Sequence, residues 1–173
     1  MTIRDYLSST DDELRKEYNI ELVERYPWVV PPDRYDPLYV HPQDTNPKYD
    51  YSWTMLDDLP DGWRLAFQDE LCEEIQQEYE KLTPDQREAF YIVQTKEKFG
   101  GMRMYMSFYV DSIEGIIEKY SRKSECLCVV CGKPATYIST GWICPWCDDH
   151  IESDRINGYV KIEEWFKGED NGY

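Results

Sequence analysis

The sequence predicts an α+β fold, in which two or three amphipathic helices pack on an antiparallel β-hairpin or small sheet, followed by a C-terminal four-cysteine zinc ribbon. Three observations support this prediction. Apolar residues recur at helical spacing in residues 11–26, 63–82 and 111–123. Two β-rich runs flank a Gly-Gly pair within residues 89–110. Two Cys-x-x-Cys pairs, separated by twelve residues, then follow near the C-terminus.

The composition indicates one domain with a substantial core, or one domain plus a small metal module. The chain has 173 residues, of which 41% are apolar and 15% aromatic, enough to bury a core. Its 35 acidic and 19 basic residues give a net charge of −16. Generic nucleic-acid binding needs clustered Lys and Arg, so this charge favours a basic protein partner over nucleic acid. The alternative is that the charge only keeps the protein dispersed.

The sequence shows neither a signal peptide nor a long apolar run, so we expect no membrane association. Four of the six cysteines stand at metal-ligand spacing. A reducing compartment fits this pattern better than disulfides do, and we expect a cytoplasmic location.

Residues 1–26 are predicted to hold a helix from about 11 to 26, with Thr10 and Glu13 as a capping box and Pro27 at its end. Residues 27–62 contain seven of the ten prolines, interleaved with Trp and Tyr. We expect an extended arm that lays these rings on the core. An aromatic docking surface for a partner is the alternative.

Residues 63–124 are expected to form the α+β core. The first helix, 63–82, carries an apolar stripe that consists of Trp63, Phe67, Leu71, Ile75, Tyr79 and Leu82. Cys72 beside it is expected to be a core residue. The outer face is acidic, and Glu70, Glu73, Glu74 and Glu78 form a candidate surface for a basic partner. An ordinary solvated face is the alternative.

The hairpin is predicted to turn at Gly100-Gly101. This register places Phe99 opposite Met102, Lys98 opposite Arg103, and Lys96 opposite Tyr105. The core-facing side then consists of Tyr91, Val93, Phe99, Met102, Met104, Met106 and Phe108. Glu97 falls on this apolar side, so it needs a partner or a place at the rim.

The opposite side of the hairpin gathers Lys96, Lys98, Arg103 and Tyr105, which is unusual in so acidic a chain. One interpretation is that these cations pair with the acidic helices. The other is a contact site for an anion, a nucleic acid or a partner, with Tyr105 as an aromatic platform. A helix from Asp111 to about 123 follows the hairpin and completes the core.

The predicted zinc ribbon covers residues 125–150. Cys128, Cys131, Cys144 and Cys147 can supply four thiolates to one tetrahedral Zn²⁺. Four thiolates leave no open coordination position, so we expect a structural zinc ion. Cys126 and His150 also lie within reach of these pairs and stay open as alternative ligands. The tail, 151–173, is expected to pack back on the core.

No catalytic motif is evident. The two histidines, His41 and His150, lie in different segments, and neither a phosphate-binding loop nor a dinucleotide-binding motif occurs. We therefore expect no enzymatic activity and predict no catalytic residue. An unrecognised metal-dependent hydrolase is kept as an alternative.

Several longer stretches resemble a family of uncharacterised proteins from bacteriophages and bacteria. These stretches are Arg25-Tyr-Pro-Trp28, Tyr-Asp-Tyr-Ser-Trp-Thr (49–54), Leu-Pro-Asp-Gly-Trp-Arg (59–64), Val-Gln-Thr-Lys-Glu-Lys-Phe-Gly-Gly-Met-Arg-Met-Tyr (93–105), Cys-Val-Val-Cys-Gly-Lys-Pro-Ala (128–135) and Thr-Gly-Trp-Ile-Cys-Pro-Trp-Cys-Asp-Asp-His (140–150). The resemblance covers residues 14 to 150. It implies a phage setting and a zinc ribbon, and names no activity.

These observations lead to one functional hypothesis and two alternatives. The leading hypothesis is a phage-type acidic protein that binds another protein, such as a basic host nucleic-acid-binding or defence protein, with its acidic faces imitating phosphate. The first alternative is a nucleic-acid-associated module that uses the cationic hairpin face. The second is the hydrolase.

Overall fold

The computed structural model describes residues 1–32, 49–151 and 158–169 and confirms an α+β fold. Its elements, in chain order, are α1 (Ile3–Ser8), α2 (Asp12–Arg25), the 3-10 turns η1 (Pro27–Val29) and η3 (Met55–Asp58), α3 (Asp61–Tyr79), α4 (Pro84–Ala89), β1 (Ile92–Lys98), β2 (Gly101–Met106), α5 (Asp111–Ser124), β3 (Tyr137–Ser139), β4 (Pro145–Trp146), β5 (Tyr159–Lys161) and α6 (Ile162–Glu169).

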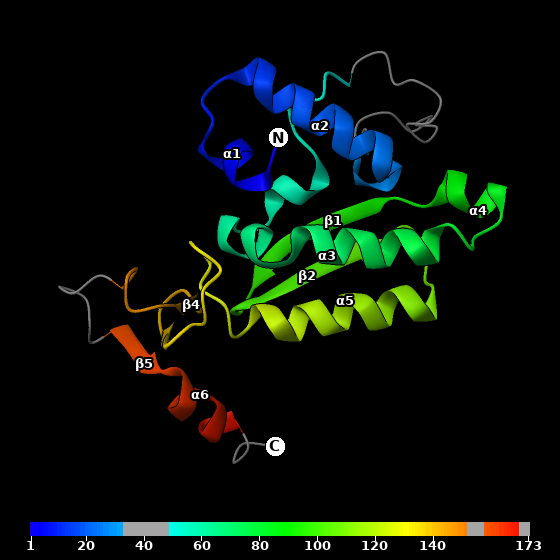
Figure 1. Cartoon of the computed structure of the whole chain (residues 1–173). Coiled ribbons are helices and arrows are strands. Elements are labelled where there is room, and N and C mark those ends of the chain that lie inside the picture. Colours follow the sequence, from blue (N-terminus) through cyan, green and yellow to red (C-terminus); the bar gives the residue numbers. More distant parts are fainter. Residues whose placement is uncertain (33–48, 152–157, 170–173) are drawn as a thin grey trace.

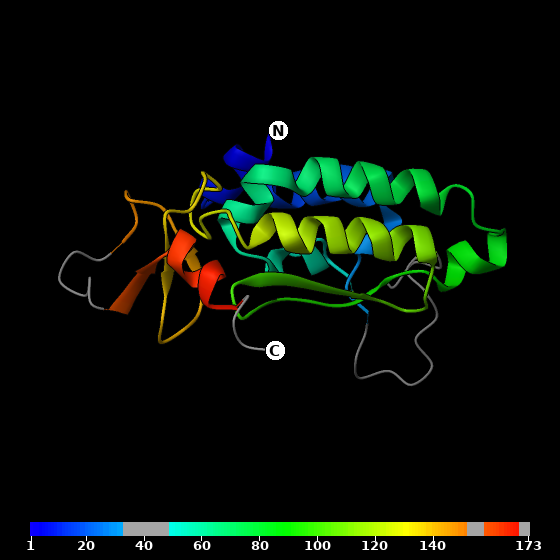
Figure 2. The ribbon, with the colours of Figure 1, turned by 90° about the horizontal axis from the view of Figure 1, so that it is seen from below.

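The helical core is built in layers. Helices α3 and α5 run side by side over one face of the β1–β2 hairpin, and α1 and α2 lie along the other side of α3 (Figures 1 and 2). The predicted stripe of α3 is buried: Trp63, Phe67, Leu71 and Ile75 are at most 2% exposed, and they pack with residues from every other layer. Cys72 is a core residue as expected.

The N-terminal helix forms almost where the periodicity predicts it, but its cap differs. The side chain of Asp11, not Thr10, accepts hydrogen bonds from the N–H groups of Glu13 and Leu14. A carboxylate accepts these bonds, and its negative charge interacts favourably with the positive N-terminal end of the helix dipole. The sequence analysis missed α1, which Thr2 and Asp5 cap reciprocally.

The described part of the proline-rich arm packs on the core. Trp28 is fully buried, and its indole N–H donates to Gln76 over 3.0 Å. Met55 and Leu56 are buried as well, whereas Trp53 is half-exposed. The rings of Tyr49 and Tyr51 contact each other, with centroids 4.7 Å apart. Tyr35 and Tyr39 of the same arm lie outside the described residues.

The hairpin turn differs by one residue from the prediction. Phe99 and Gly100 occupy the turn with φ of 53° and 81°, as a two-residue turn of the primed type requires. Lys98 therefore pairs with Gly101, and Lys96 pairs with Arg103 rather than with Tyr105. Gly101 begins strand β2, and a Cβ at this position would lie 2.8 Å from the Arg103 side chain.

A bulge in β1 changes which apolar residues face the core. The register shifts between Ile92 and Gln94, so Ile92 is buried while Val93 is exposed. The predicted inward positions of Val93 and Phe99 are therefore wrong, whereas Met102 and Met104 are buried as expected.

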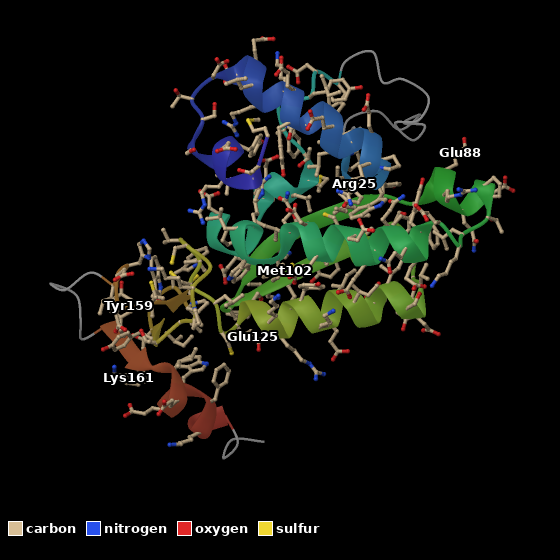
Figure 3. The ribbon with its side chains drawn as sticks, in the orientation of Figure 1. Arg25, Glu88, Met102, Glu125, Tyr159 and Lys161 are labelled. Carbon is tan, nitrogen blue, oxygen red and sulfur yellow. The ribbon has the colours of Figure 1, made fainter. Side chains whose placement is uncertain are left out.

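The tail joins the C-terminal module instead of the helical core. Strand β5 pairs antiparallel with β3 in a sheet of order β4-β3-β5, and α6 packs on it. Tyr159 and Lys161 accordingly lie beyond the end of the α3–α5 layer (Figure 3). Among the described helices, none is long and apolar enough to cross a membrane. The name C-terminal module is used below for residues 125–151 together with 158–169.

Candidate metal centre

The first half of the metal centre is a tight turn after α5. Cys128 accepts a hydrogen bond from the Gly132 N–H through its carbonyl (2.9 Å), and its own N–H donates to the Lys133 carbonyl (2.8 Å). Gly132 has φ of +73°, a conformation that glycine adopts without steric cost. The turn brings the sulfurs of Cys128 and Cys131 to the same side.

The second half is the turn from Cys147 to His150. The N–H of His150 donates to the Cys147 carbonyl over 3.0 Å, which folds the two side chains together. Cys128, Cys131, Cys147 and His150 then offer one ligand atom each, all within 4.8 Å of one another. Among the residues that the structure describes, these four side chains form a group that can bind a metal ion.

The spacing of these atoms is close to that around a tetrahedral ion, although the four ligand atoms spread over as much as 4.8 Å. Bond lengths of about 2.3 Å to sulfur and about 2.0–2.1 Å to nitrogen imply ligand–ligand distances of about 3.6–3.8 Å. The Cys131 and Cys147 sulfurs are 3.6 Å apart, and His150 Nδ1 lies 3.6 Å from the Cys128 sulfur and 3.2 Å from the Cys147 sulfur. The donor set is three thiols and one imidazole, a set typical of zinc.

Cys144, the predicted fourth ligand, is not in this group, and His150 stands in its place. Strand β4 (Pro145–Trp146) separates Cys144 from Cys147, and residues three apart in an extended strand point to opposite faces. Cys144 is buried instead near Glu97. Burial, together with the negative charge of Glu97, raises the pKa of its thiol to about 12. Cys126 is exposed and also lies outside the group.

The backbone around the ligands favours a thiolate at Cys128. Burial by itself would raise the pKa of this thiol, but N–H groups of Val130, Cys147 and Cys131 donate to its sulfur and lower the pKa overall. Burial raises the pKa of Cys147 to about 11, and the neighbouring thiols add to this. A bound cation favours the deprotonated form of such a group.

The metal centre is attached directly to the helical core. The N–H of Gly62, in the first turn of α3, donates to the Val129 carbonyl (2.8 Å), and the Trp63 indole donates to the Leu127 carbonyl (3.0 Å). A Cβ at Gly62 would lie 2.1 Å from the Cys128 carbonyl oxygen. Helix α3 thus approaches the ligand turn as closely as backbones allow.

The cationic side of the hairpin forms as predicted, although with a shifted register. Lys96 lies over the Tyr105 ring (5.5 Å) and donates to Gln94. Arg103 donates to the Met102 carbonyl and to Ser121. Within the described ranges, Lys96, Lys98 and Arg103 make no ion pair. The pairing with acidic helices that one interpretation expected is therefore not seen there.

The four glutamates of α3, in contrast, each have an intramolecular cation. Glu70 pairs with Lys123, Glu73 with Arg25, Glu74 with Lys119, and Glu78 with Lys81, at N–O distances of 2.6 to 2.9 Å. The hydrogen bonds from Arg25, Lys119 and Lys81 hold the pKa values of Glu73, Glu74 and Glu78 below the usual range. Glu73 ties α3 to α2, Glu70 and Glu74 tie it to α5, and Glu78 pairs locally with Lys81. These four glutamates therefore do not form a bare acidic face.

Exposed aromatic residues gather where the hairpin tip meets the C-terminal module. Phe99 is 70% exposed and Trp142 is 77% exposed, and both line a shallow pocket of about 220 Å³ with Lys98 and Ile143. The Trp142 indole donates to Glu97 over 2.9 Å, and the other oxygen of Glu97 accepts from the Gly100 N–H. Glu97 thereby has the partners that its predicted position required. We call Lys98, Phe99, Trp142 and Ile143 the tip patch.

No family model matches the sequence, and neither a curated protein nor a solved structure is significantly similar to it.

Proposed function

We propose that this chain is a non-enzymatic protein that acts by binding another protein, with a structural zinc ion in its C-terminal module. The observation that carries the proposal is the combination of a metal group with four protein ligands and a patch of exposed aromatic side chains beside it. Four protein ligands leave the metal ion without an open coordination position, and the aromatic patch supplies a contact surface.

The zinc ion follows from the donor set. Cys₃His groups with tetrahedral spacing hold structural zinc, and catalytic sites instead keep one position for water. A hydrolase at this centre would therefore have to lose a protein ligand first. If zinc is structural, chelation should unfold the C-terminal module, detected as a loss of near-ultraviolet tryptophan circular dichroism. A module that keeps its signal after the metal is removed would contradict this role.

The tip patch supports protein binding by its composition. Binding energy in protein interfaces concentrates in a few aromatic and arginine residues that become desolvated. Phe99 and Trp142 present large apolar surfaces, and Lys98 lines the same pocket. The net charge of −16 adds long-range attraction for a basic partner.

The resemblance to bacteriophage proteins gives this proposal its biological setting. In that setting the partner is a basic host protein of nucleic-acid metabolism or defence, and binding inhibits it. The ion-paired acids of α3 do not support imitation of phosphate by that face. The attraction for a basic partner then comes from the whole molecule rather than from this ridge.

The test is capture of partners from a bacterial host lysate at low and high salt. The wild-type protein should retain a basic protein at low salt and lose it as salt rises. The double variant Phe99→Ala/Trp142→Ala should lose the partner. The matched control Trp53→Ala removes a half-exposed ring outside the patch and should retain it. Recovery of no partner by the wild-type protein, or equal recovery by the double variant, would contradict the proposal.

Single-stranded nucleic acid is a second candidate ligand. It is favoured by the side chains of Lys96, Lys98 and Tyr105, because stacking platforms beside cations bind such strands. A gel shift at low salt that disappears with Lys96→Glu/Lys98→Glu would favour this candidate over a protein partner. Arg103 is less suitable for the test because it also bonds to Met102 and Ser121.

A further inference from the structure

Strand β2 is an edge strand, and α5 closes only the first part of its free edge. The sheet has two strands, β1 and β2. At Met102 the N–H donates to the Ser124 hydroxyl (2.8 Å), and the carbonyl accepts from the Ser121 hydroxyl (2.8 Å). Met102 therefore directs its backbone groups away from β1, and two serines of α5 satisfy them.

Two residues further on, at Met104, α5 makes no hydrogen bond to this edge within the described residues, and Met104 is 4% exposed. In an antiparallel pair, residues alternate between those that bond to the partner strand and those whose N–H and C=O point away. Met104 follows Met102 by two, so its backbone groups point to the same side as those of Met102. Within the described ranges no hydrogen bond to them is present. A segment placed there would find one free donor and one free acceptor.

This edge opens into a groove of about 410 Å³ between β2 and α5. Figure 2 looks onto this side, where no other helix or strand crosses the middle of the hairpin and α5. The groove is lined mainly by apolar and aromatic side chains, by the carboxylates of Glu114 and Glu118, and by the polar side chains of Arg103 and Ser121.

The lining specifies the side chains that an added strand would need. Side chains on its helix-facing side would lie over Ile117 and Met106 and end near Glu114 and Glu118, which suits the aliphatic stem and charged end of Lys or Arg. Glu118 already pairs with the exposed Arg122, so at that position the added cation would have to compete with Arg122. Side chains on its other side would lie beside Tyr105, which suits β-branched or aromatic residues.

We propose that the free edge of β2 binds an extended segment of a basic partner as an additional antiparallel or parallel strand, with Lys or Arg alternating with β-branched or aromatic residues. This inference rests on the proposed function and specifies its binding mode. Strand addition combines main-chain hydrogen bonds with pockets for alternate side chains, and both are present here. A second copy of the chain is a poorer occupant because each copy carries a net charge of −16.

The first experiment uses peptides and leaves the protein unchanged. The probe is a nine-residue peptide of alternating Lys and Val, titrated into the full chain by NMR. Two further peptides carry N-methyl groups on either the odd or the even residues. The parent should bind and slow hydrogen exchange at the Met104 amide. One methylated peptide should bind equally well, and the other should lose at least tenfold in affinity, because only alternate N–H groups face β2.

The second experiment tests the charges. The double variant Glu114→Gln/Glu118→Gln should weaken binding of the parent peptide fivefold to tenfold. The matched control Glu88→Gln/Glu163→Gln removes two exposed carboxylates outside the groove and should leave affinity within twofold. No binding of the parent, or equal binding of all three peptides, would overturn strand addition. Protection of Met104 with dimer formation in the absence of peptide would overturn it in favour of a second copy.

The two proposals fail separately. If lysate capture depends on Phe99 and Trp142 while the peptides do not bind, strand addition is wrong and the proposed function stands. If capture fails altogether, the proposed function is wrong whatever the peptides do.

Discussion

At the scale of single residues, an ion pair between Arg64 and Asp57 stands inside the helical core. The Arg64 side chain is 2% exposed, and its Nη1 lies 2.6 Å from Asp57 Oδ1. Tyr6 also donates to Asp57, and Arg64 Nε donates to Gln68, which in turn donates to Tyr18. This network joins α1, α2, η3 and α3 through polar contacts where the rest of the core is apolar.

Breaking this pair should be strongly destabilising. The substitution Asp57→Asn leaves a buried guanidinium without its counter-charge, and loss of one partner from a buried pair costs about 3–5 kcal/mol. The measurement is the free energy of unfolding in urea. As control, Arg122→Gln removes an exposed pair with Glu118 and should cost less than about 1 kcal/mol. Equal effects of the two substitutions would refute the importance of the buried pair.

The same pair predicts how stability depends on pH. Burial alone would raise the pKa of Asp57, but Arg64, Tyr6 and the Thr54 N–H outweigh it and hold the pKa below its usual range. A lowered pKa in the folded state stabilises the protein above the unfolded value, near 3.9, and this stability is lost as pH falls through the folded pKa. Urea midpoints of the wild type should therefore fall below about pH 4. A smaller fall for Asp57→Asn is expected, and an identical fall would exclude Asp57 as the cause.

Phe99 carries backbone strain at an exposed position. Its φ of 53° lies in the left-handed region, which costs a bulky residue about 1–2 kcal/mol. Asn tolerates this region, so Phe99→Asn should raise the free energy of unfolding by about 0.5–1 kcal/mol while it weakens partner capture. The control Tyr109→Asn removes an exposed ring from a residue whose backbone φ is not positive, so no gain in the free energy of unfolding is expected. A destabilised Phe99→Asn protein would show that the ring contributes to the fold.

At the scale of elements, two glycines allow α3 to approach the metal turn. A Cβ at Gly62 would lie 2.1 Å from the Cys128 carbonyl oxygen, and a Cβ at Gly132 would lie 2.3 Å from the Gly62 carbonyl oxygen. Both contacts are with backbone, which cannot rotate aside. The contact explains why helix α3 and the C-terminal module hold a fixed position relative to each other.

Gly62→Ala should therefore push the module away from α3. We expect a loss of about 1–3 kcal/mol, as for overpacked cores, and a lower thermal midpoint. Gly115→Ala is the matched control, because a Cβ there meets nothing within 4 Å. In a helix this change should stabilise by about 0.5–1 kcal/mol. A neutral Gly62→Ala protein would contradict the close contact.

Helices α2, α3 and α5 were predictable from the sequence because their periodic apolar faces depend on local spacing, whereas the short helices α1 and α4 were not predicted. The stripe of α3 and the cysteine turn at Cys128 follow from such spacing. The exact position of the hairpin turn was not predictable, since glycines at both 100 and 101 permit the predicted turn, and the observed turn uses Phe99 and Gly100. His150 was named only as an alternative ligand, because Cys144 and His150 both stand three residues from Cys147. The extended path through Pro145 was the one local sign against Cys144.

At the scale of the whole molecule, the glutamates of α3 form ion pairs, and the molecule still carries a large negative net charge. The four glutamates of α3 form ion pairs with Arg25, Lys81, Lys119 and Lys123, and the net charge of −16 is a property of the whole molecule. The hairpin lies at the centre of the functional proposals, because its tip borders the metal module and its free edge borders α5. The metal-binding residues stabilise the C-terminal module and are not part of the proposed contact surface.

The most direct test is the zinc content of two cysteine variants. Metal should be measured by mass spectrometry on the purified wild-type protein, on Cys144→Ser and on Cys147→Ser, with folding followed by circular dichroism. The proposed ligand set predicts one zinc per chain in the wild type and in Cys144→Ser, and loss of zinc in Cys147→Ser. Loss of zinc from Cys144→Ser, or a wild-type protein that binds none, would contradict a centre made of Cys128, Cys131, Cys147 and His150.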